Sequence, residues 1–442
     1  MKEIIKKFIP EFLVSWYHFS LAYLGAFWYG FPSQKMVIIG IAGTRGKTTT
    51  ANMIWSCLTS AGYKAGQIST ANIRIGAEER MNEYHMTMPG RFVIQKLLLE
   101  MRNAGCRFAI VETPSEGVEQ WRHKGIAYDI VVMTSLYPEY LAVHGLSFER
   151  CKKMHERIFA ELASHPKKSL EGNSIYGEPC RTIPKTIVVN RDIKERDLFL
   201  RHKADLKITF SASGEADVAA KDIAATPGGV AFLVGTERYR LGLLGAFNVP
   251  NALAAIAVAS ALGIHPDVIR EGLSSLGTVP GRMEEVVCGQ RFRVFVDYAH
   301  DAVSIEAVLK AAREIASAGK VILLLGAEGG GRDKQKRPVM GELAAKLADY
   351  AIVTNVDPYD DDPSEIIEDI AKGSEKFGKT REKTLFAIED RKEGIRKAFA
   401  LAHEGDVVLI TGKGAEQSMN VHGKKIPWDD RVITREILTA MS

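Results

Sequence analysis

The residues best suited to chemistry form a glycine-rich segment with one lysine, GIAGTRGKTTT at positions 40–50. The glycines of such a loop let backbone N–H groups surround a triphosphate, Lys47 reaches the β- and γ-phosphates, and the Thr48 hydroxyl ligates Mg²⁺. The spacing departs from the strict Walker pattern, because Ile41 stands where its first glycine is expected. The alternative is a glycine-rich turn with an unrelated lysine, but an apolar run before the loop and a helical pattern after it favour an ATP site. The expected ATP contacts are Gly43, Thr44, Arg45, Gly46, Lys47, Thr48 and Thr49.

A carboxylate for the metal is expected from Glu112, which follows the apolar run 108–111. Magnesium on a triphosphate usually takes one or two carboxylates. If residues 36–41 and 108–111 are neighbouring parallel strands, their carboxyl ends meet and Glu112 lies near Thr48. A strand-end carboxylate can also cap a helix or face solvent. The position at the correct end of the sheet favours a metal site made by Thr48 and Glu112.

The wider pattern of the chain predicts the parallel sheet that this site needs. Apolar runs alternate with helical patterns; the runs lie at 36–41, 108–111 and 129–133, and the helical patterns at 47–61, 91–103 and 148–162. This βαβ rhythm predicts an α/β fold with a mostly parallel sheet. Short alternating strands within residues 184–245 predict an antiparallel extension of this first domain.

A second βα series follows a segment at 277–282 whose Pro280 and Gly281 suggest a linker. Its expected strands lie at 293–297, 321–325, 351–354, 384–388 and 407–410. They predict a second, smaller doubly wound domain, with its chemistry in the loops after the strands.

Composition excludes several classes of protein. The 442 residues are 46% apolar, which suits two or three domains. Lysine plus arginine number 58 against 54 acidic residues, so no basic field argues for nucleic acid. Five widely spaced cysteines without a C-x-x-C pair disfavour a disulfide framework or a zinc ribbon and fit a reducing cytoplasm. No small-residue cleavage site follows the apolar start, which disfavours a secretory signal.

Nine segments in order resemble the Mur ligases, and most closely the MurE-type UDP-N-acetylmuramoyl-tripeptide synthetases. The segments are GTRGKTTT, IVETPSEG, MTSLYPEYLAVHG, LLGAFNVPNALAA, VPGRMEEV, VDYAHDAVSIEAVL, GGGRDKQKRPVMG, TNVDPYDDDP and GKGAEQ. The resemblance covers about residues 36–440. It implies a P-loop central ATPase domain with a mostly parallel sheet at 36–282, a Rossmann-like, amino-acid-binding C-terminal domain at 283–442, and an aromatic helical segment at 1–35.

The family also implies a reaction. ATP, with Mg²⁺, phosphorylates a carboxylate of a muramoyl-peptide-like acceptor, and an amino acid's amine attacks the acyl phosphate to form an amide. Two anions must meet, so cations at Lys47, at the metal on Glu112 and at Arg282 fit the physics of the step. These ligases act in cell-wall peptide synthesis in the cytoplasm.

The resemblance assigns further residues by their matching positions. Asn248 and the stretch from Asp297 to His300 would hold adenosine, and Arg282 would reach the phosphates when the C-terminal domain closes. The acceptor would contact Thr87, Pro89 and Ser115. The incoming amino acid would contact Arg332, Asp333, Arg337, Asp357, Lys413 and Glu416.

Simpler interpretations exist for several of these residues. Asn248 can cap a helix starting near residue 251, and Asp297 can be a strand-end turn residue. Arg332 and Arg337 can be solvated cations in a charged run.

The chain departs from the family at several positions. Glu139-Tyr140 stands where an Asp-His pair is usual, and His155 takes the place of a lysine that is carbamylated in many relatives. His155 can ligate a metal or pair with phosphate, or it can be a satisfied surface histidine; His144 can be a turn residue.

Two more departures concern the amino acid. Asp357-Pro358-Tyr359 replaces an Asn-Pro-Arg sequence whose arginine binds meso-diaminopimelate in relatives, and Ala415 replaces a histidine. Loss of that arginine, with Asp357 and Asp360 to Asp362 favouring a cation, predicts an amino acid other than meso-diaminopimelate, such as lysine.

The first 31 residues hold ten of the 36 aromatic residues, and 12–34 contain no charged side chain. The phosphate-loop strand begins too early for the family's usual UDP-binding domain, so this segment occupies its place. Its length suits a membrane span, but Trp16-Tyr17 and Trp28-Tyr29 lie only about 18 Å apart as a helix, too close for two interfacial belts. We therefore expect an interfacial helix following Lys2, Lys6 and Lys7, or a helix docked on the ATPase domain, with residues 8–31 making a peripheral membrane contact or a homodimer.

Two alternatives to a cell-wall ligase on a UDP-sugar remain open. One is a ligase acting on a lipid-linked or other non-UDP acceptor, such as a poly-γ-glutamate-type substrate. The other is a nucleotide-binding protein that has lost catalysis, suggested by Tyr140, His155 and Ala415.

Overall fold

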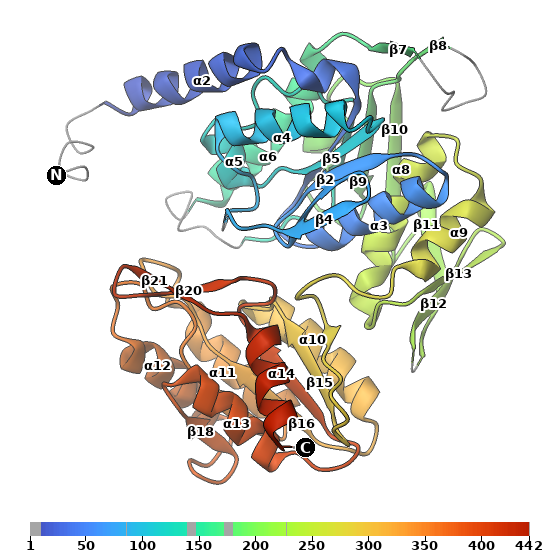
Figure 1. Cartoon of the computed structure of the whole chain (residues 1–442). Helices are drawn as coiled ribbons and strands as arrows, with labels where there is room; N and C mark the ends of the chain where they lie inside the picture. Colours follow the sequence, from blue (N-terminus) through green and yellow to red (C-terminus); the bar gives the residue numbers. More distant parts are fainter. Residues whose placement is uncertain (1–9, 85, 139–146, 172–179, 227, 442) are drawn as a thin grey trace. The chain divides into compact units, whose positions relative to one another are not determined.

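The computed structural model describes residues 10–84, 86–138, 147–171, 180–226 and 228–441. The chain divides into two compact units. The first holds the residues up to 224 with 231–242 and 248–276, and the second holds 225–230, 243–247 and the residues from 277 onward. Each unit is built around one large sheet (Figure 1).

The sheet of the first unit has eleven strands in the order β13-β12-β11-β10-β9-β6-β1-β5-β2-β3-β4. Their bounds are β1 Val37–Ala42, β2 Ala65–Ile68, β3 Asn72–Ile75, β4 Glu78–Met81, β5 Phe108–Glu112, β6 Ile130–Met133, β9 Thr186–Asn190, β10 Leu206–Ser211, β11 Val218–Thr226, β12 Gly229–Val234 and β13 Glu237–Leu241. The central strands from β2 to β10 pair in parallel, which confirms the predicted α/β fold.

The register of β1 with its neighbours β5 and β6 shows which ends of these strands lie together. Ile41 lies opposite Glu112 of β5, and Ala42 lies opposite Met133 of β6. The three carboxyl ends therefore meet at one edge, where ligands bind in sheets of this kind.

Helices cover both faces of this sheet (Figure 1). They are α3 Lys47–Ser60, α4 Arg91–Asn103, α5 Ser115–Glu119, α6 Phe148–Ser164, α7 Arg196–Leu200, α8 Val249–Ala261 and α9 Pro266–Ser275. The helix α4 carries Ile94, Leu97, Leu98 and Met101 at i, i+3, i+4 and i+7, and all four are buried against the sheet. The contacts of α3 are with α8 and α9.

The predicted antiparallel extension at 184–245 is wrong for three of its strands. Strand β9 pairs in parallel with β6, β10 pairs in parallel with β9, and the start of β11 pairs in parallel with β10. Between β9 and β10 lie residues 191–205, which include α7. A connection of this length can cross over and return the chain in the same direction, whereas antiparallel neighbours need only a short turn.

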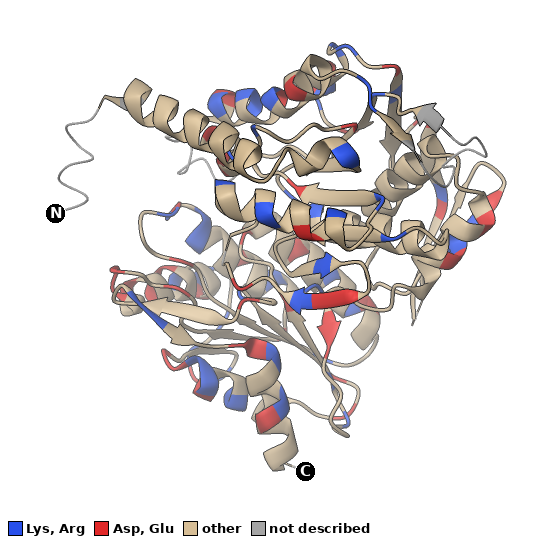
Figure 2. Ribbon diagram, turned by 45° about the horizontal axis from the view of Figure 1, so that its top comes forward, with Lys and Arg blue, Asp and Glu red and all other residues tan. Residues whose placement is uncertain are grey.

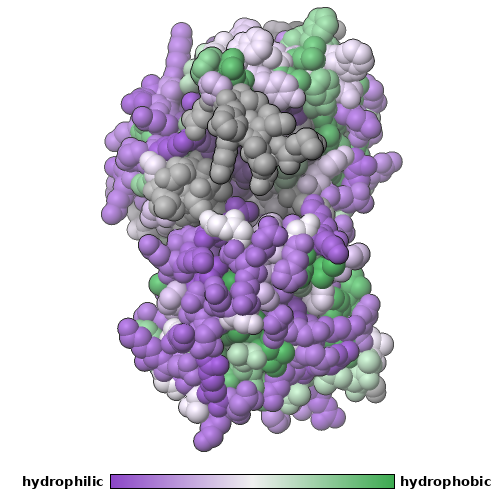
Figure 3. Space-filling model, turned by 90° about the vertical axis from the view of Figure 1, so that its left-hand side faces the viewer, coloured by the Kyte–Doolittle hydropathy of each residue, from purple (hydrophilic) through white to green (hydrophobic). Residues whose placement is uncertain are grey.

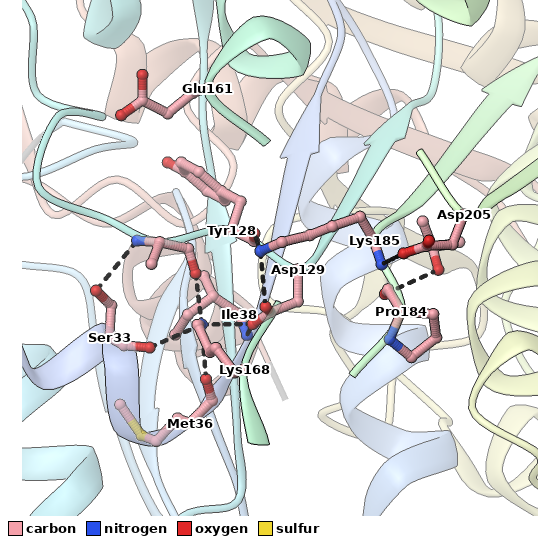
Figure 4. Close-up of polar contacts among 12 residues, drawn as sticks. Ser33, Met36, Ile38, Tyr128, Asp129, Glu161, Lys168, Pro184, Lys185 and Asp205 are labelled. Carbon is pink, nitrogen blue, oxygen red and sulfur yellow. Dashed lines mark hydrogen bonds and ion pairs between the residues drawn. The ribbon is translucent and has the colours of Figure 1, made fainter. Parts of the chain in front are cut away.

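A buried ion cluster locks the opposite, amino end of the sheet (Figure 4). The Asp129 carboxylate pairs with Lys168 at 2.5 Å and Lys185 at 3.1 Å, and it accepts from the Ile38 N–H at 2.9 Å. Lys168 also donates to the carbonyls of Ser33, Met36 and Ala127. Burial lowers the pKa of Lys168 to about 8, against the opposing effect of Asp129. Full pairing of these buried charges suits a structural role.

The second unit has a six-stranded sheet in the order β14-β15-β19-β16-β17-β18. The strands are β14 Glu284–Glu285, β15 Arg293–Asp297, β16 Val321–Leu325, β17 Tyr350–Val353, β18 Leu385–Ala387 and β19 Val407–Thr411. All but β14 are parallel. Alternate residues of β16 enter two different cores, one on each face of the sheet. This is the doubly wound arrangement expected for the second domain.

The remaining elements of the second unit are five helices and a hairpin. The helices are α10 Ala302–Ala316, α11 Lys336–Leu347, α12 Pro363–Lys376, α13 Arg391–Leu401 and α14 Asp430–Met441; the hairpin is β20 Ser418–Val421 with β21 Lys424–Pro427. Short pieces elsewhere are β7 Ser169–Glu171, β8 Cys180–Thr182, η1 Pro32–Lys35 and η3 Ala246–Asn248.

The helix α2, Glu11–Trp28, leads into η1 and β1. It packs against α4, which confirms docking on the first unit, and it shows no charged residue beyond its first turn (Figure 2). None of the described helices is long and apolar enough to cross a membrane. The surface in Figure 3 is mostly hydrophilic, with apolar side chains in smaller groups, so an exposed apolar helix face needs an explanation.

Candidate active site

The glycine-rich segment forms a loop between β1 and α3. Gly43 has φ +137° and Gly46 has φ +79°, a backbone conformation that favours glycine. Lys47 begins α3, and its Nζ donates to the carbonyls of Gly43 at 2.7 Å and Thr44 at 3.1 Å. The lysine therefore lies along the loop at the N-terminus of a helix, where anions bind readily.

The loop after β6 holds this segment in place. Ser135 Oγ accepts from the Arg45 N–H at 2.8 Å and lies 3.1 Å from the Thr44 hydroxyl. The Thr134 hydroxyl donates to Arg45 O at 2.6 Å, and the Arg45 guanidinium lies over the Tyr137 ring. Sequence reasoning missed Thr134 and Ser135, although both follow the strand that neighbours β1.

Glu112 ends β5 fully buried and is bound by Thr70. The Thr70 N–H donates to Glu112 Oε1 at 3.1 Å, and the Thr70 hydroxyl donates to Oε2 at 3.0 Å. The same hydroxyl lies 2.9 Å from the hydroxyl of Thr87. The structure thus brings the predicted metal carboxylate and a predicted acceptor residue together through Thr70, which sequence reasoning missed.

A magnesium ion on a triphosphate suits these residues. A hydroxyl at the start of α3 and a buried carboxylate on the adjacent strand supply the hard oxygen ligands that Mg²⁺ takes, with phosphates and water completing its shell. The described part of the chain contains no group of three or more His, Cys, Asp or Glu side chains placed to hold a metal ion. A metal held entirely by protein ligands is therefore not seen among those residues.

Asparagine side chains join α3 to α8. Thr50 Oγ1 donates to Asn251 Oδ1 at 3.4 Å, and Asn251 Nδ2 donates to Asn248 Oδ1 at 3.1 Å. A Cβ on Gly46 would meet Asn251 Oδ1 at 2.2 Å, so only glycine fits there. Asn248 makes no side-chain cap to α8, contrary to the capping interpretation. Asn251 was not predicted from the sequence.

His155 lies on α6 and is 1% exposed, so the interpretation as a surface histidine is wrong. Ser115 begins α5 and hydrogen-bonds the buried thiol of Cys151, whose pKa burial raises. Pro89 is buried one residue before Gly90, the N-cap of α4. The departures at Glu139-Tyr140 and His144 lie outside the described residues.

In the second unit, Lys413 is the centre of a buried polar cluster. Its Nζ pairs with Asp357 Oδ2 and with Glu416 Oε2, each at 2.6 Å. The Tyr298 hydroxyl donates to Glu416 Oε1 at 3.5 Å, and the Arg282 guanidinium lies 4.4 Å from the centre of the Tyr298 ring. Burial raises the pKa of Glu416, partly offset by Lys413, and burial with the Glu416 charge raises the pKa of Tyr298 well above its usual value.

The segment at 277–282 is a tight turn within the second unit. The Arg282 N–H donates to Val279 O at 3.0 Å. Gly281 has φ +63°, and a Cβ there would meet the backbone N of Ala415 at 2.1 Å. This close approach fixes Arg282 beside the loop that carries Lys413 and Glu416.

Asp297 and His300 follow β15. The Asp297 carboxylate accepts from the N–H groups of Met283 and Ala299, both at 2.7 Å, which is the geometry of a strand-end turn residue. His300 Nδ1 lies 2.7 Å from Tyr298 O.

Lys336 joins His300 to Glu328. Its Nζ donates to His300 O and to Glu328 Oε2. Burial opposes ionisation of Glu328, but Lys336 and His300 lower the pKa of this carboxyl to about 2. Glu328 and Lys336 were not predicted, although both flank the glycine-rich GGGRDK segment.

The three remaining residues predicted to contact the amino acid have different surroundings. Arg332 is exposed and hydrogen-bonds Tyr359, whose ring centre lies 6.0 Å from its guanidinium. Asp333 is exposed and caps the next turn by accepting from the Gln335 N–H at 2.9 Å. Arg337 is 1% exposed and donates to Asp369 at 3.0 Å, so its interpretation as a solvated cation is wrong.

Known proteins share both units. The sequence model of the Mur ligase middle domain matches residues 41–259, and that of the Mur ligase glutamate ligase domain matches residues 281–414. A UDP-N-acetylmuramyl-tripeptide synthetase of Roseiflexus sp. (strain RS-1) is 36% identical over 441 residues, which is 98% of this chain and 84% of the relative.

Two further proteins support the same assignment. The UDP-N-acetylmuramoyl-L-alanyl-D-glutamate--2,6-diaminopimelate ligase of Geobacillus thermodenitrificans (strain NG80-2) is 36% identical over 420 residues, 94% of this chain and 81% of the relative. A solved structure of a ligase with that name has a TM-score of 0.60 and 28% identity, and covers 92% of this chain and 79% of its own.

A glycine-rich loop between a strand and a helix, a buried strand-end carboxylate and a Rossmann-like second unit are features expected of an ATP-dependent ligase that forms C–N bonds. The chain belongs to the Mur ligase family, whose members perform this chemistry in the synthesis of the peptidoglycan peptide. The resemblance drawn from the nine sequence segments is confirmed.

Proposed function

We propose that this ligase joins an amino acid to a carboxylate of a muramoyl-peptide-like acceptor through an acyl phosphate. The γ-phosphoryl group of ATP passes to the carboxylate, and ADP leaves. The amine then attacks the acyl carbon, phosphate departs, and the amine loses a proton to give the amide. The observation that carries the proposal is that Lys47 and Thr48 begin the helix after β1, while buried Glu112 ends the adjacent parallel strand β5.

The residues of the first unit bind and activate ATP. The backbone of Gly43 to Thr49 surrounds the phosphates, and Lys47 neutralises charge on the β- and γ-phosphates. Thr48 and Glu112 would hold Mg²⁺, which supplies further charge neutralisation when bound. Asn248 contributes to the adenosine site, and buried His155 on α6 is a candidate to face the phosphate or metal.

The acceptor binds along Thr87, Pro89 and Ser115. The contact from Thr87 to Thr70 and on to Glu112 supports this, because an acceptor carboxylate held there lies next to the group that is phosphorylated. The acceptor chemistry is that of a muramoyl peptide, carried on UDP or on another group such as a lipid.

The second unit supplies the amino-acid site and a cation. Arg332, exposed beside Tyr359, suits the α-carboxylate, and the Asp357–Lys413–Glu416 cluster suits the amino group. Asp333 and Arg337 shape this region through the turn cap and the buried pairing with Asp369. Arg282 neutralises the transferred phosphoryl group, His300 contacts adenosine, and Asp297 shapes the turn that carries His300.

The amino acid is one other than meso-diaminopimelate. Tyr359 occupies the place of an arginine, so this position offers no guanidinium for the distal carboxylate of meso-diaminopimelate. Tyr359 instead hydrogen-bonds Arg332, which is assigned to the α-carboxylate. The acidic residues Asp357 and Asp360 to Asp362 are weaker evidence for a cationic amino acid than the sequence suggests. Asp357 already pairs with Lys413, and Asp362 caps α12. Lysine remains a candidate.

The chain acts in the cytoplasm, where ATP and reduced cysteines are found. We also propose that residues 8–31 make an external contact, with a membrane surface or with a second copy of this chain. The exposed apolar side chains of α2 support this contact.

Phosphate release with an acceptor and a panel of amino acids tests the proposal. We expect release to require both substrates, to be lowest with meso-diaminopimelate, and to fall at least about a hundredfold in Lys47→Ala. Full activity of Lys47→Ala would overturn the ATP site. A clear preference for meso-diaminopimelate would overturn only the amino-acid assignment.

A further inference from the structure

The outer face of α2 is the largest run of exposed apolar side chains on one described element. Phe12, Trp16, Phe27 and Trp28 are 69%, 68%, 71% and 73% exposed. Leu13, Tyr17, Tyr23 and Leu24 are exposed as well. Burial of large apolar side chains is strongly favourable, so eight of them left in water on one helix, six of them aromatic, indicate a surface that something covers.

These eight side chains form one continuous face. At 3.6 residues per turn, Phe12, Tyr23, Trp16 and Phe27 fall within about 60° of the helix circumference. Leu13, Leu24, Tyr17 and Trp28 extend this to an arc of about 160°. Ser20 is the one polar residue within the arc, and no charged residue occurs between 12 and 34.

The opposite side of α2 is fixed to the first unit. The Trp121 indole N–H donates to Ser15 Oγ at 2.7 Å, and Phe19 packs edge-on against the Trp121 ring at 5.4 Å. Ala22 and Ala26 are buried, and Gly125 lies so close that a Cβ on it would meet Ala26 Cβ at 2.6 Å. The face is therefore presented on a docked helix and not on a loose tail.

We propose that this face of α2 docks on the surface of an anionic lipid bilayer, lying in the interface parallel to it. Tryptophan and tyrosine, the side chains that prefer the headgroup boundary, provide four of the eight exposed residues. The arc is as wide as half the helix, which a planar medium covers, whereas pairing with one partner helix uses a narrower stripe.

The charges of the residues before α2 also favour an anionic bilayer as the partner of this face. The sequence before α2 carries Lys2, Lys6 and Lys7 against a single acidic residue, Glu3. Basic residues next to an apolar interfacial helix are attracted to anionic lipids. A span is not expected from α2, since no described helix meets the length and apolarity that crossing requires.

The docking goes beyond the proposed ligase reaction, but it has a consequence for it. Helix α4, on which α2 packs, begins at Arg91, two residues after Pro89 of the proposed acceptor segment. A docked α2 would hold this segment near the bilayer, where an acceptor carried on a lipid is found.

Vesicle co-sedimentation of the full chain tests the proposal without reference to catalysis. The vesicles are phosphatidylglycerol with phosphatidylcholine, and phosphatidylcholine alone. We expect binding to the anionic vesicles that weakens with added salt, and a loss of at least about tenfold in the variant Trp16→Ser/Phe27→Ser/Trp28→Ser. The matched control is Val287→Ser/Phe377→Ser/Val432→Ser, which removes three exposed apolar side chains elsewhere and should bind like the wild type.

Thermal melting and sedimentation equilibrium complete the test. A melting temperature like that of the wild type shows that the α2 variant is folded. Failure of the wild-type chain to bind either kind of vesicle would overturn the proposal. A wild-type dimer that the α2 substitutions dissociate, without vesicle binding, would assign the face to a second copy instead.

Discussion

At the scale of single residues, Thr70 links Glu112 to Thr87, a connection that could not be predicted from the sequence. It lies between β2 and β3, and it connects Glu112, 42 residues later, with Thr87, 17 residues later. Two donors to one carboxylate fix the orientation of its plane. We therefore expect Thr70 to position Glu112 in the proposed Mg²⁺ site.

The substitution Thr70→Val removes the hydroxyl and keeps the shape of the side chain. Groups that orient a metal ligand typically contribute about 10–100-fold to metal affinity. We expect Mn²⁺ to bind the ADP complex about tenfold more weakly, as measured by electron paramagnetic resonance titration, with a raised KM for the acceptor.

The control for this prediction is Thr70→Ser, which keeps the hydroxyl and should restore Mn²⁺ affinity. If Thr70→Val and the wild type bind Mn²⁺ equally, then Thr70 does not position Glu112.

At the scale of elements, the turn at 279–282 depends on glycine. Alanine at Gly281 would require φ +63° and would bring Cβ within 2.1 Å of the Ala415 backbone. The turn would move away from the loop with Lys413 and Glu416, and Arg282 would move with it. Misplacement of a group by about 1 Å can cost about a hundredfold in rate, so we expect Gly281→Ala to lower kcat by about that factor.

Gly289→Ala is the matched control, because Gly289 also has positive φ (+87°) but has open space around it. It should keep nearly all of the activity. A wild-type kcat in Gly281→Ala would show that the turn does not position Arg282.

The segment under α2 gives a pH dependence of stability. His123 is buried beside Trp121, and neither ring nitrogen has a hydrogen-bond partner among the described residues. Burial lowers the pKa of His123 to about 3. Below pH 6.5, the ordinary pKa of histidine, His123 is protonated in the unfolded chain but stays neutral in the folded chain. The free energy of unfolding therefore falls as the pH decreases from 6.5 toward 3.

At pH 5 this histidine should cost about 2 kcal/mol of unfolding free energy, and nothing at pH 7.5. Urea unfolding at both pH values measures it, and His123→Leu should remove that part of the acid loss. His403→Leu, at an exposed position, should leave the loss unchanged. An equal acid loss in His123→Leu and the wild type would contradict the assignment.

Elements with a strong local pattern could be predicted, and those defined by distant partners could not. The helix at 91–103 and the strands at 293–297 and 321–325 have the predicted bounds. The apolar residues of the helix repeat at the helical period, and each strand contains a short continuous apolar run. Strands β3 and β4 were missed, since each has only four residues and at least half of them are polar or charged. The parallel direction of β9 and β10 depends on the short helix α7, which carries little helical pattern.

The same division holds for the site. Lys47 and Glu112 were predicted because a loop before a helix and a carboxylate after a strand are local signals. Thr70, Ser135 and Asn251 act through partners 17 to 201 residues away, which only the fold brings together.

At the scale of the whole molecule, we propose that the enzyme phosphorylates a carboxylate of the acceptor before the amide forms. In the proposed reaction the first unit contributes the glycine-rich loop and Glu112, and the second contributes Arg282 and the polar cluster around Lys413. In this sequence of steps one oxygen of the acceptor carboxylate must leave with phosphate, and the other must stay in the amide.

The most direct test is oxygen transfer from a labelled acceptor. The acceptor is UDP-N-acetylmuramoyl-L-alanyl-D-glutamate, or its lipid-linked form, with ¹⁸O in its carboxylates, and the amino acid is the one that releases most phosphate. Mass spectrometry of the products should find one ¹⁸O in each phosphate and one ¹⁸O in the new amide carbonyl. Phosphate without ¹⁸O, released as the amide forms, would contradict the acyl-phosphate mechanism.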